Sequence, residues 1–129
     1  MTTTTAQPAA VTLLLVDNEP LVRTMLAEVL RGAGFDVNTA SSGIEAVEMA
    51  RTAPPALVLM DVQMPGFSGW DALARLQETV PGLLVVMMSG TECREEARER
   101  GAAGFLLKPY RPRDVLDYIR EMTGGALRA

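Results

Sequence analysis

Short runs of apolar residues alternate with longer stretches of helical spacing five times along the chain, between Val11 and Met122. The apolar runs have the length of β-strands and cover residues 11–16, 36–40, 56–61, 83–88 and 104–107. The stretches that follow them repeat apolar residues every three or four positions, over about 20–32, 42–53, 69–78, 92–100 and 112–122. This alternation indicates βα units built around a parallel sheet.

The runs differ in how completely apolar they are, and this difference predicts their order in the sheet. The first, third and fourth runs are apolar throughout, which is typical of central strands covered on both faces. The second and fifth are shorter or mixed, so we expect them at the edges. The strand order 2-1-3-4-5 fits this pattern and predicts an α/β fold, a flavodoxin-like doubly wound parallel sheet with five helices. We expect the domain to span residues 11–123, between a disordered tail at 1–10 and a short tail at 124–129.

The helical stretches predict which faces pack on the sheet. The first helix is expected to turn six apolar residues inward: Leu21, Val22, Met25, Leu26, Val29 and Leu30. The second is expected to bury Ile44, Val47 and Ala50. The fourth offers only Cys93 and Ala97 for burial, so we expect a weakly anchored helix, which is either able to shift or simply exposed.

Polar residues mark the ends of four predicted strands. Asp17 follows the first strand, Asp61 ends the third, Ser89 follows the fourth and Lys108 follows the fifth. In a doubly wound sheet the ligand site lies beyond the carboxyl ends of the central strands, where the strand order reverses. We therefore expect these four side chains to converge, although about ninety residues of sequence separate the first from the last.

The composition excludes several classes of function. The 129 residues include one cysteine, Cys93, and no histidine, which excludes the usual zinc ligand sets and any Ser-His or Cys-His nucleophile pair. A net charge of −4 disfavours a nucleic-acid surface. The sequence shows neither a signal-peptide pattern nor an apolar stretch long enough to span a bilayer, so we expect a cytoplasmic protein with no membrane partner.

The four converging residues predict a site for a metal ion and a phosphoryl group. Two carboxylates without histidine or thiolate favour Mg²⁺, which takes few protein ligands and keeps several waters. A lysine and a hydroxyl beside the metal suit phosphoryl oxygens. The sequence has no GxxxxGK[ST] glycine loop, so a nucleotide is not expected. Asp61 is then left as the group that could itself accept a phosphoryl group.

Four sequence motifs resemble the signature positions of the receiver domain of two-component response regulators. They are Asp17-Asn18-Glu19-Pro20, Met60-Asp61-Val62-Gln63-Met64-Pro65-Gly66, Met88-Ser89-Gly90 and Lys108-Pro109-Tyr110. The resemblance covers about residues 11–123, with the motifs in matching order and spacing. It implies that Asp61 accepts a phosphoryl group from a phosphohistidine on a histidine kinase or phosphotransfer protein. It also implies a signalling domain rather than an enzyme.

The resemblance further implies a Mg²⁺ site made by Asp17, Asp61 and the backbone carbonyl of Gln63. Asn18 stands where the family normally carries a second acid that binds the metal directly. An amide oxygen can coordinate Mg²⁺ but brings no charge, so we expect weaker Mg²⁺ binding than at a two-acid site. Glu19 either compensates for this loss or favours the N-terminus of the first helix.

The resemblance also implies how a signal would leave the site. Ser89 and Lys108 would hold the phosphoryl oxygens, with a cis peptide bond between Lys108 and Pro109. Phe105 occupies the family's aromatic switch position. When Ser89 is drawn to the phosphoryl group, the Phe105 side chain would turn inward. These movements would alter the face formed by the fourth helix, the fifth strand and the fifth helix. That face would meet a downstream protein partner or a second copy of the chain.

Several of these residues have a plainer interpretation as well. Phe105 is equally well a core residue, and Ser89 an N-cap of the fourth helix unless Thr91 takes that position. Asn18 raises the alternative of a pseudo-receiver that binds proteins without being phosphorylated. An aspartyl phosphatase of the haloacid dehalogenase type also places Asp after a strand, but its second acid would fall at Gln63. We expect a stand-alone receiver, since few residues follow the fifth helix, with a receiver cut from a longer hybrid kinase or regulator as the alternative.

Overall fold

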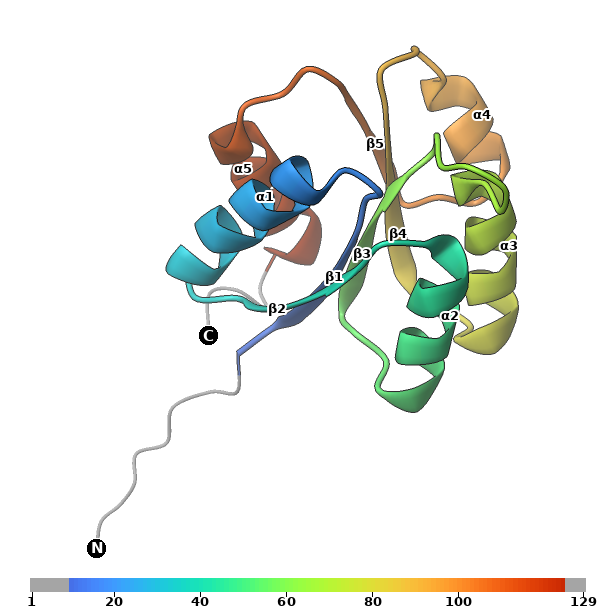
Figure 1. The fold of residues 1–129 in the computed structure, drawn as a ribbon, viewed down its shortest axis with the longest axis horizontal. Helices are drawn as coiled ribbons and strands as arrows, with labels where there is room; N and C mark the ends of the chain where they lie inside the picture. Colours follow the sequence, from blue (N-terminus) through green and yellow to red (C-terminus); the bar gives the residue numbers. More distant parts are fainter. Residues whose placement is uncertain (1–9, 125–129) are drawn as a thin grey trace, which may run out of the picture.

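The computed structural model describes residues 10–124, and its strands and helices alternate as predicted (Figure 1). The elements are β1 (Thr12–Val16), α1 (Pro20–Gly32), β2 (Asp36–Ala40), α2 (Gly43–Thr52), β3 (Leu57–Asp61), α3 (Gly69–Thr79), β4 (Leu84–Ser89), α4 (Arg94–Glu99), β5 (Gly104–Leu107) and α5 (Pro112–Thr123). The tails expected at 1–10 and 124–129 lie outside the described residues, apart from Ala10 and Gly124. No described helix is long and apolar enough to cross a membrane.

Five parallel strands form one sheet in the order β2-β1-β3-β4-β5, which confirms the predicted flavodoxin-like α/β topology. Helices α1 and α5 cover one face of the sheet, and α2, α3 and α4 cover the other (Figure 1). Alternate residues of β1 enter two separate hydrophobic cores, with Leu13 and Leu15 on the α1 side and Leu14 and Val16 on the α2 side. This double coverage explains why the central strands are apolar throughout.

The register of the strands brings their polar ends to one edge of the sheet. Asp17 comes directly after β1 and stands level with Asp61, the last residue of β3. Ser89 ends β4 one residue beyond that level, and Lys108 follows β5 one residue further out. The Lys108 side chain therefore reaches back to the two aspartates from beyond the carboxyl ends of their strands, and not from the same level along the strands.

The exposed side of α1 corrects the predicted packing face of that helix. Leu21 is 84% exposed and Met25 is 53% exposed, so neither packs on the sheet. The residues of α1 that are buried are Leu26, Ala27 and Leu30. The predicted apolar face spans about half of the helix circumference. The sheet packs against the side of this face that carries Leu26 and Leu30, and the side that carries Leu21 and Met25 is exposed to solvent.

Ile44 of α2 was also predicted to be buried and is 62% exposed. The buried stripe of α2 follows a strict helical spacing: Gly43, Ala46, Val47 and Ala50. Ile44 lies about 100° around the helix from Gly43 and so falls outside that stripe. Gly43 packs closely against α3 and its preceding loop, since a Cβ there would meet Ala72 and Phe67 at 2.9 Å.

Helix α4 is six residues long, shorter than the predicted 92–100. Glu92 lies ahead of the helix, where its carboxylate accepts a hydrogen bond from the Arg94 N–H at 2.8 Å. The chain turns away after the helix at Gly101, whose φ of 89° is accessible to glycine. Ala97 is the one residue of α4 that is buried, as the pattern predicted.

Candidate functional site

Three neighbouring strands end in the same local geometry at the carboxyl edge of the sheet. In each case a buried polar side chain accepts a hydrogen bond from the backbone N–H two residues further on, which closes a small turn. The bonds join Glu19 N to Asp17 Oδ1 at 2.9 Å, Gln63 N to Asp61 Oδ1 at 3.2 Å and Thr91 N to Ser89 Oγ at 3.0 Å. Each aspartate therefore keeps its second oxygen, Oδ2, for another partner.

Lys108 is that partner for both aspartates. Its Nζ lies 3.4 Å from Asp17 Oδ2 and 3.4 Å from Asp61 Oδ2. The backbone N–H of Lys108 donates to the carbonyl oxygen of Ser89 at 2.8 Å, and the peptide bond between Lys108 and Pro109 is cis. The aspartate side chains are 0% and 5% exposed, against 22% for the lysine. One ammonium group thus serves two buried carboxylates, and these three groups together carry one net negative charge.

The pKa shifts of Asp61 and Lys108 follow from burial and from the charges of this cluster. Burial raises the pKa of Asp61, and although Lys108 opposes that shift, the nearby charge of Asp17 adds to it, so the net direction is upward. Burial alone would lower the pKa of Lys108, but the charges of Asp61 and Asp17 outweigh burial and raise it. Lys108 is therefore held as a cation, while burial keeps the pKa of Asp61 raised although Lys108 opposes that shift.

The donor set fits a small hard cation. The buried side-chain donors are carboxylate oxygens, and the described residues hold no group of three or more acidic, histidine or cysteine side chains that could form a closed metal cage. Mg²⁺ suits such a site, since it uses one or two carboxylates and keeps several waters. Asn18 and Gln63 are exposed at the rim of the same edge, beside the two aspartates. The Gln63 N–H is already bound to Asp61, which turns that loop toward the carboxylate.

Ser89 and Phe105 are both buried, at 1% and 4% exposure. Ser89 Oγ accepts the Thr91 N–H, and neither residue caps α4, whose N-cap is Cys93 without a side-chain capping bond. The N-cap interpretation of Ser89 was therefore wrong. Phe105 lies in the core, with the guanidinium of Arg94 5.3 Å from its ring centroid, so in this structure it is a packed core residue.

Two residues near the site were given no role in it by sequence reasoning. Gly69 begins α3 and donates its N–H to Val62 O at 2.9 Å, directly beside Asp61. The position of this glycine soon after Asp61 could have indicated a close backbone contact, but from the sequence it was interpreted only as the start of a helix. Tyr110, next to the Lys-Pro pair, places its hydroxyl 3.5 Å from Met88 Sδ, and burial raises its pKa, with Asp17 as the next cause.

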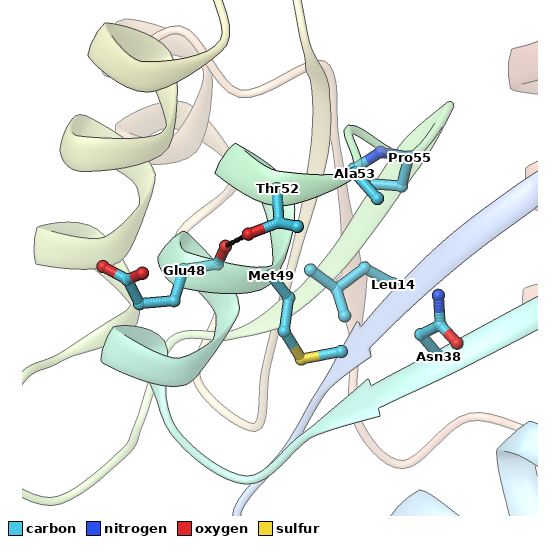
Figure 2. Close-up of a pocket in the computed structure, with 7 residues that line it drawn as sticks. All are labelled: Leu14, Asn38, Glu48, Met49, Thr52, Ala53 and Pro55. Carbon is cyan, nitrogen blue, oxygen red and sulfur yellow. Dashed lines mark hydrogen bonds between the residues drawn. The ribbon is translucent and has the colours of Figure 1, made fainter.

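A hollow at the opposite margin of the sheet is separate from this site. It lies between α2 and strands β1 and β2, and the residues drawn in Figure 2 are Leu14, Asn38, Glu48, Met49, Thr52, Ala53 and Pro55. Figure 2 also shows the Thr52 hydroxyl donating to the Glu48 carbonyl oxygen at 3.1 Å within α2. The hollow contains none of the four converging polar residues, so it offers positions for control substitutions.

Comparison with known proteins identifies the family. Residues 13–120 match the model of the response regulator receiver domain. The nitrate/nitrite response regulator protein NarL of Escherichia coli (strain K12) is 33% identical over 121 residues, which are 90% of this chain and 56% of that protein. The chemotaxis protein CheY4 of Vibrio cholerae is 28% identical with a TM-score of 0.81, over 88% of this chain and 99% of that one.

A third relative was solved with magnesium in its active-site cleft. It is the receiver domain of the sensor histidine kinase PA1611 from Pseudomonas aeruginosa PAO1, 23% identical with a TM-score of 0.80, over 91% of this chain and all of that one. The chain spans about half the length of the curated relatives it matches. The match to the family model and the fold agree with the motifs at the strand ends, and the chain belongs to the response regulator receiver domain family.

Proposed function

We propose that this receiver accepts a phosphoryl group on Asp61, from a phosphohistidine of a histidine kinase or phosphotransfer protein, in a reaction that requires Mg²⁺. Receiver domains are signalling phosphoacceptors of two-component systems. The observation that carries the proposal is the buried pair of carboxylates, Asp17 and Asp61, sharing the single ammonium of Lys108 at 3.4 Å each. The net negative charge of this cluster attracts a divalent cation, and the cation together with Lys108 can offset the negative charge of an incoming phosphoryl group.

The transfer is a single displacement at phosphorus. Asp61 Oδ2, which is not tied to the backbone, attacks the phosphorus of the phosphohistidine, and a P–O bond forms while the P–N bond breaks. The imidazole leaves with the electron pair and takes up a proton. The product is an acyl phosphate on Asp61. Mg²⁺, when bound, neutralises charge on the phosphoryl oxygens.

Each surrounding residue has a role in this proposal. Asp17 and Asp61 would hold Mg²⁺, with the backbone carbonyl of Gln63 and the amide oxygen of Asn18 as further ligands. Magnesium in the cleft of the PA1611 receiver domain supports the choice of metal. Lys108 would move from the carboxylates to the phosphoryl oxygens, since its Nζ already faces the attacking oxygen.

The same proposal gives the route of the signal. Ser89 would leave its bond to the Thr91 N–H and donate its hydroxyl to the phosphoryl group. Phe105, packed beneath Arg94 in the structure, would respond to that movement. The face of α4, β5 and α5 would then change for a downstream protein partner or for a second copy of the chain. We infer no direct contact with nucleic acid for residues 11–123.

The test is phosphorylation from a small-molecule phosphodonor. We expect one phosphoryl adduct by intact mass when the protein is incubated with acetyl phosphate and Mg²⁺, and no adduct when a chelator removes the metal. Borohydride reduction converts an aspartyl phosphate to homoserine, which locates the adduct in peptide mass spectra. No adduct at any Mg²⁺ concentration, or an adduct away from Asp61, would contradict the proposal.

Asn18 favours a second candidate, a pseudo-receiver that binds its partner without phosphorylation. Asn18 is exposed at the rim of the cluster and brings no charge. Lys108 already neutralises one of the two buried carboxylates, so the cluster has only one net negative charge with which to attract Mg²⁺. The adduct experiment separates the two functions, because a pseudo-receiver gives no adduct at any Mg²⁺ concentration.

We expect Asn18→Asp to tighten Mg²⁺ binding about tenfold, since a carboxylate at position 18 adds both an oxygen ligand and a full negative charge. The dissociation constant is measured from the rise in Tm with Mg²⁺ concentration, because a ligand that binds only the folded state stabilises it. The matched control is Asn38→Asp, the same chemical change in the separate hollow of Figure 2. Equal Mg²⁺ affinity in the Asn18 variant and the wild type would show that Asn18 costs the site nothing.

A further inference from the structure

We propose that Glu19 takes the place of the acid missing at position 18 and acts as a carboxylate ligand of the metal, directly or through a bound water. This inference rests on the proposed function, because it concerns the same Mg²⁺ site. It assigns a specific role to a residue that the sequence left with two interpretations.

Glu19 is fixed beside the carboxylates by its backbone. Its N–H donates to Asp17 Oδ1 at 2.9 Å, so the residue cannot move away without opening the turn after β1. Its carboxylate Oε1 lies 3.8 Å from Lys108 Nζ, the cation that also contacts Asp17 and Asp61. Three carboxylates therefore lie within 3.8 Å of one ammonium, and the third belongs to Glu19. Among the described residues no three acidic side chains are close enough together to hold a metal ion as they stand, so Glu19 has to turn toward the ion.

The side chain of Glu19 does not cap the helix that follows it. Glu19 is the N-cap residue of α1, but it makes no side-chain capping bond. Serine side chains do make such bonds in this protein: Ser42 accepts from Glu45 N at the start of α2, and Ser68 accepts from Asp71 N at the start of α3. The carboxylate of Glu19 is instead directed toward Lys108.

The charge of the cluster shows why a third carboxylate matters in this chain. Asp17, Asp61 and Lys108 sum to one negative charge, and a divalent cation would leave the cluster with one positive charge. Glu19 brings the sum to two negative charges, the same as a cluster with a second acid at position 18 and no Glu19. Its side chain is 60% exposed, so it can turn from Lys108 to a metal ion without leaving a buried position.

The test is a double-mutant cycle on Mg²⁺ affinity, measured by the shift in Tm without any phosphodonor. In the native background, Glu19→Gln is expected to weaken Mg²⁺ binding roughly three- to tenfold. In the Asn18→Asp background, the same substitution is expected to change affinity less than about twofold, because the new acid occupies the position that Glu19 serves. Glu28→Gln removes one charge from an exposed position of α1 about 13 Å further along the helix and is the control.

The outcomes separate this inference from the function on which it rests. An equal loss of affinity in both backgrounds means that Glu19 acts as a distant charge and overturns the ligand role. A lower Tm without metal, with unchanged Mg²⁺ affinity, assigns Glu19 to the helix N-terminus and also overturns it. If the wild type binds no Mg²⁺ in the tens of millimolar range, the proposed Mg²⁺-dependent phosphorylation itself is contradicted. A wild type that forms the adduct while Glu19→Gln keeps full Mg²⁺ affinity contradicts the inference alone.

Discussion

Asp61→Asn is expected to abolish the phosphoryl adduct and, at the same time, to raise the free energy of unfolding at pH 7. The adduct is lost because an amide is not a nucleophile toward phosphorus. The fold gains stability because a buried carboxylate with a raised pKa is replaced by a neutral group of the same shape. Lys108 is not left unpaired, since Asp17 Oδ2 remains 3.4 Å away.

The pH dependence of this gain follows from the direction of the shift. The folded-state pKa of Asp61 lies above its ordinary value of 3.8, so the ionised carboxylate costs stability above the folded-state pKa. Below about pH 3.8 the carboxyl is protonated in both states and the cost disappears. The stability difference between Asp61→Asn and the wild type, measured by urea unfolding, should therefore be largest near pH 7 and shrink as the pH falls toward 3.8.

The control for this substitution is Asp36→Asn, which changes an exposed aspartate at the start of β2. It should leave both the adduct and the stability unchanged. An Asp61→Asn variant that is less stable than the wild type at pH 7 would mean that the ion pair between Asp61 and Lys108 stabilises the fold by more than the burial of the Asp61 carboxylate destabilises it. Loss of the adduct together with increased stability would exclude misfolding as the reason for the loss.

The sheet and the convergence of its polar ends could be predicted from sequence because both follow from local pattern. A strand covered on both faces is apolar throughout, and parallel strands deliver their carboxyl ends to one edge. That is sufficient to place Asp17, Asp61, Ser89 and Lys108 together. The register adds what the pattern cannot: the aspartates are level, while Lys108 stands two residues further out and reaches both.

The anchoring of α4 could not be predicted by counting apolar residues. Ala97 is buried as expected, but two arginines at the ends of the helix also pack on aromatic rings. Arg94 lies over Phe105 at 5.3 Å, and Arg100 lies over Trp70 at 4.9 Å. Each such contact contributes about 0.5–1 kcal/mol at an exposed site. The sequence pattern treats these arginines as solvated charges, because the rings they cover come from other elements of the fold.

Close approach of two backbone segments is likewise invisible in a hydrophobic pattern, and Gly69 is the clearest case. A Cβ at Gly69 would lie 2.6 Å from Val62 Cα and closer still to the carbonyl oxygen of Asp61. Both are backbone atoms, which cannot turn aside as a side chain would. The start of α3 is thus packed against the segment that carries the proposed phosphoacceptor, held by the Gly69 N–H bond to Val62 O.

Gly69→Ala is therefore expected to destabilise the fold by about 2–4 kcal/mol, because one methyl group forces the start of α3 away from the strand end. The same displacement should slow phosphorylation of Asp61, since it moves the loop that orients the carboxylate. Urea unfolding measures the first effect, and the initial rate of adduct formation the second. Gly32→Ala is the matched control, since a Cβ there meets nothing within 4 Å and should change stability by no more than about 1 kcal/mol. A Gly69→Ala variant as stable as the wild type would show that α3 can move without cost, and the placement of Asp61 would then depend on β3 alone.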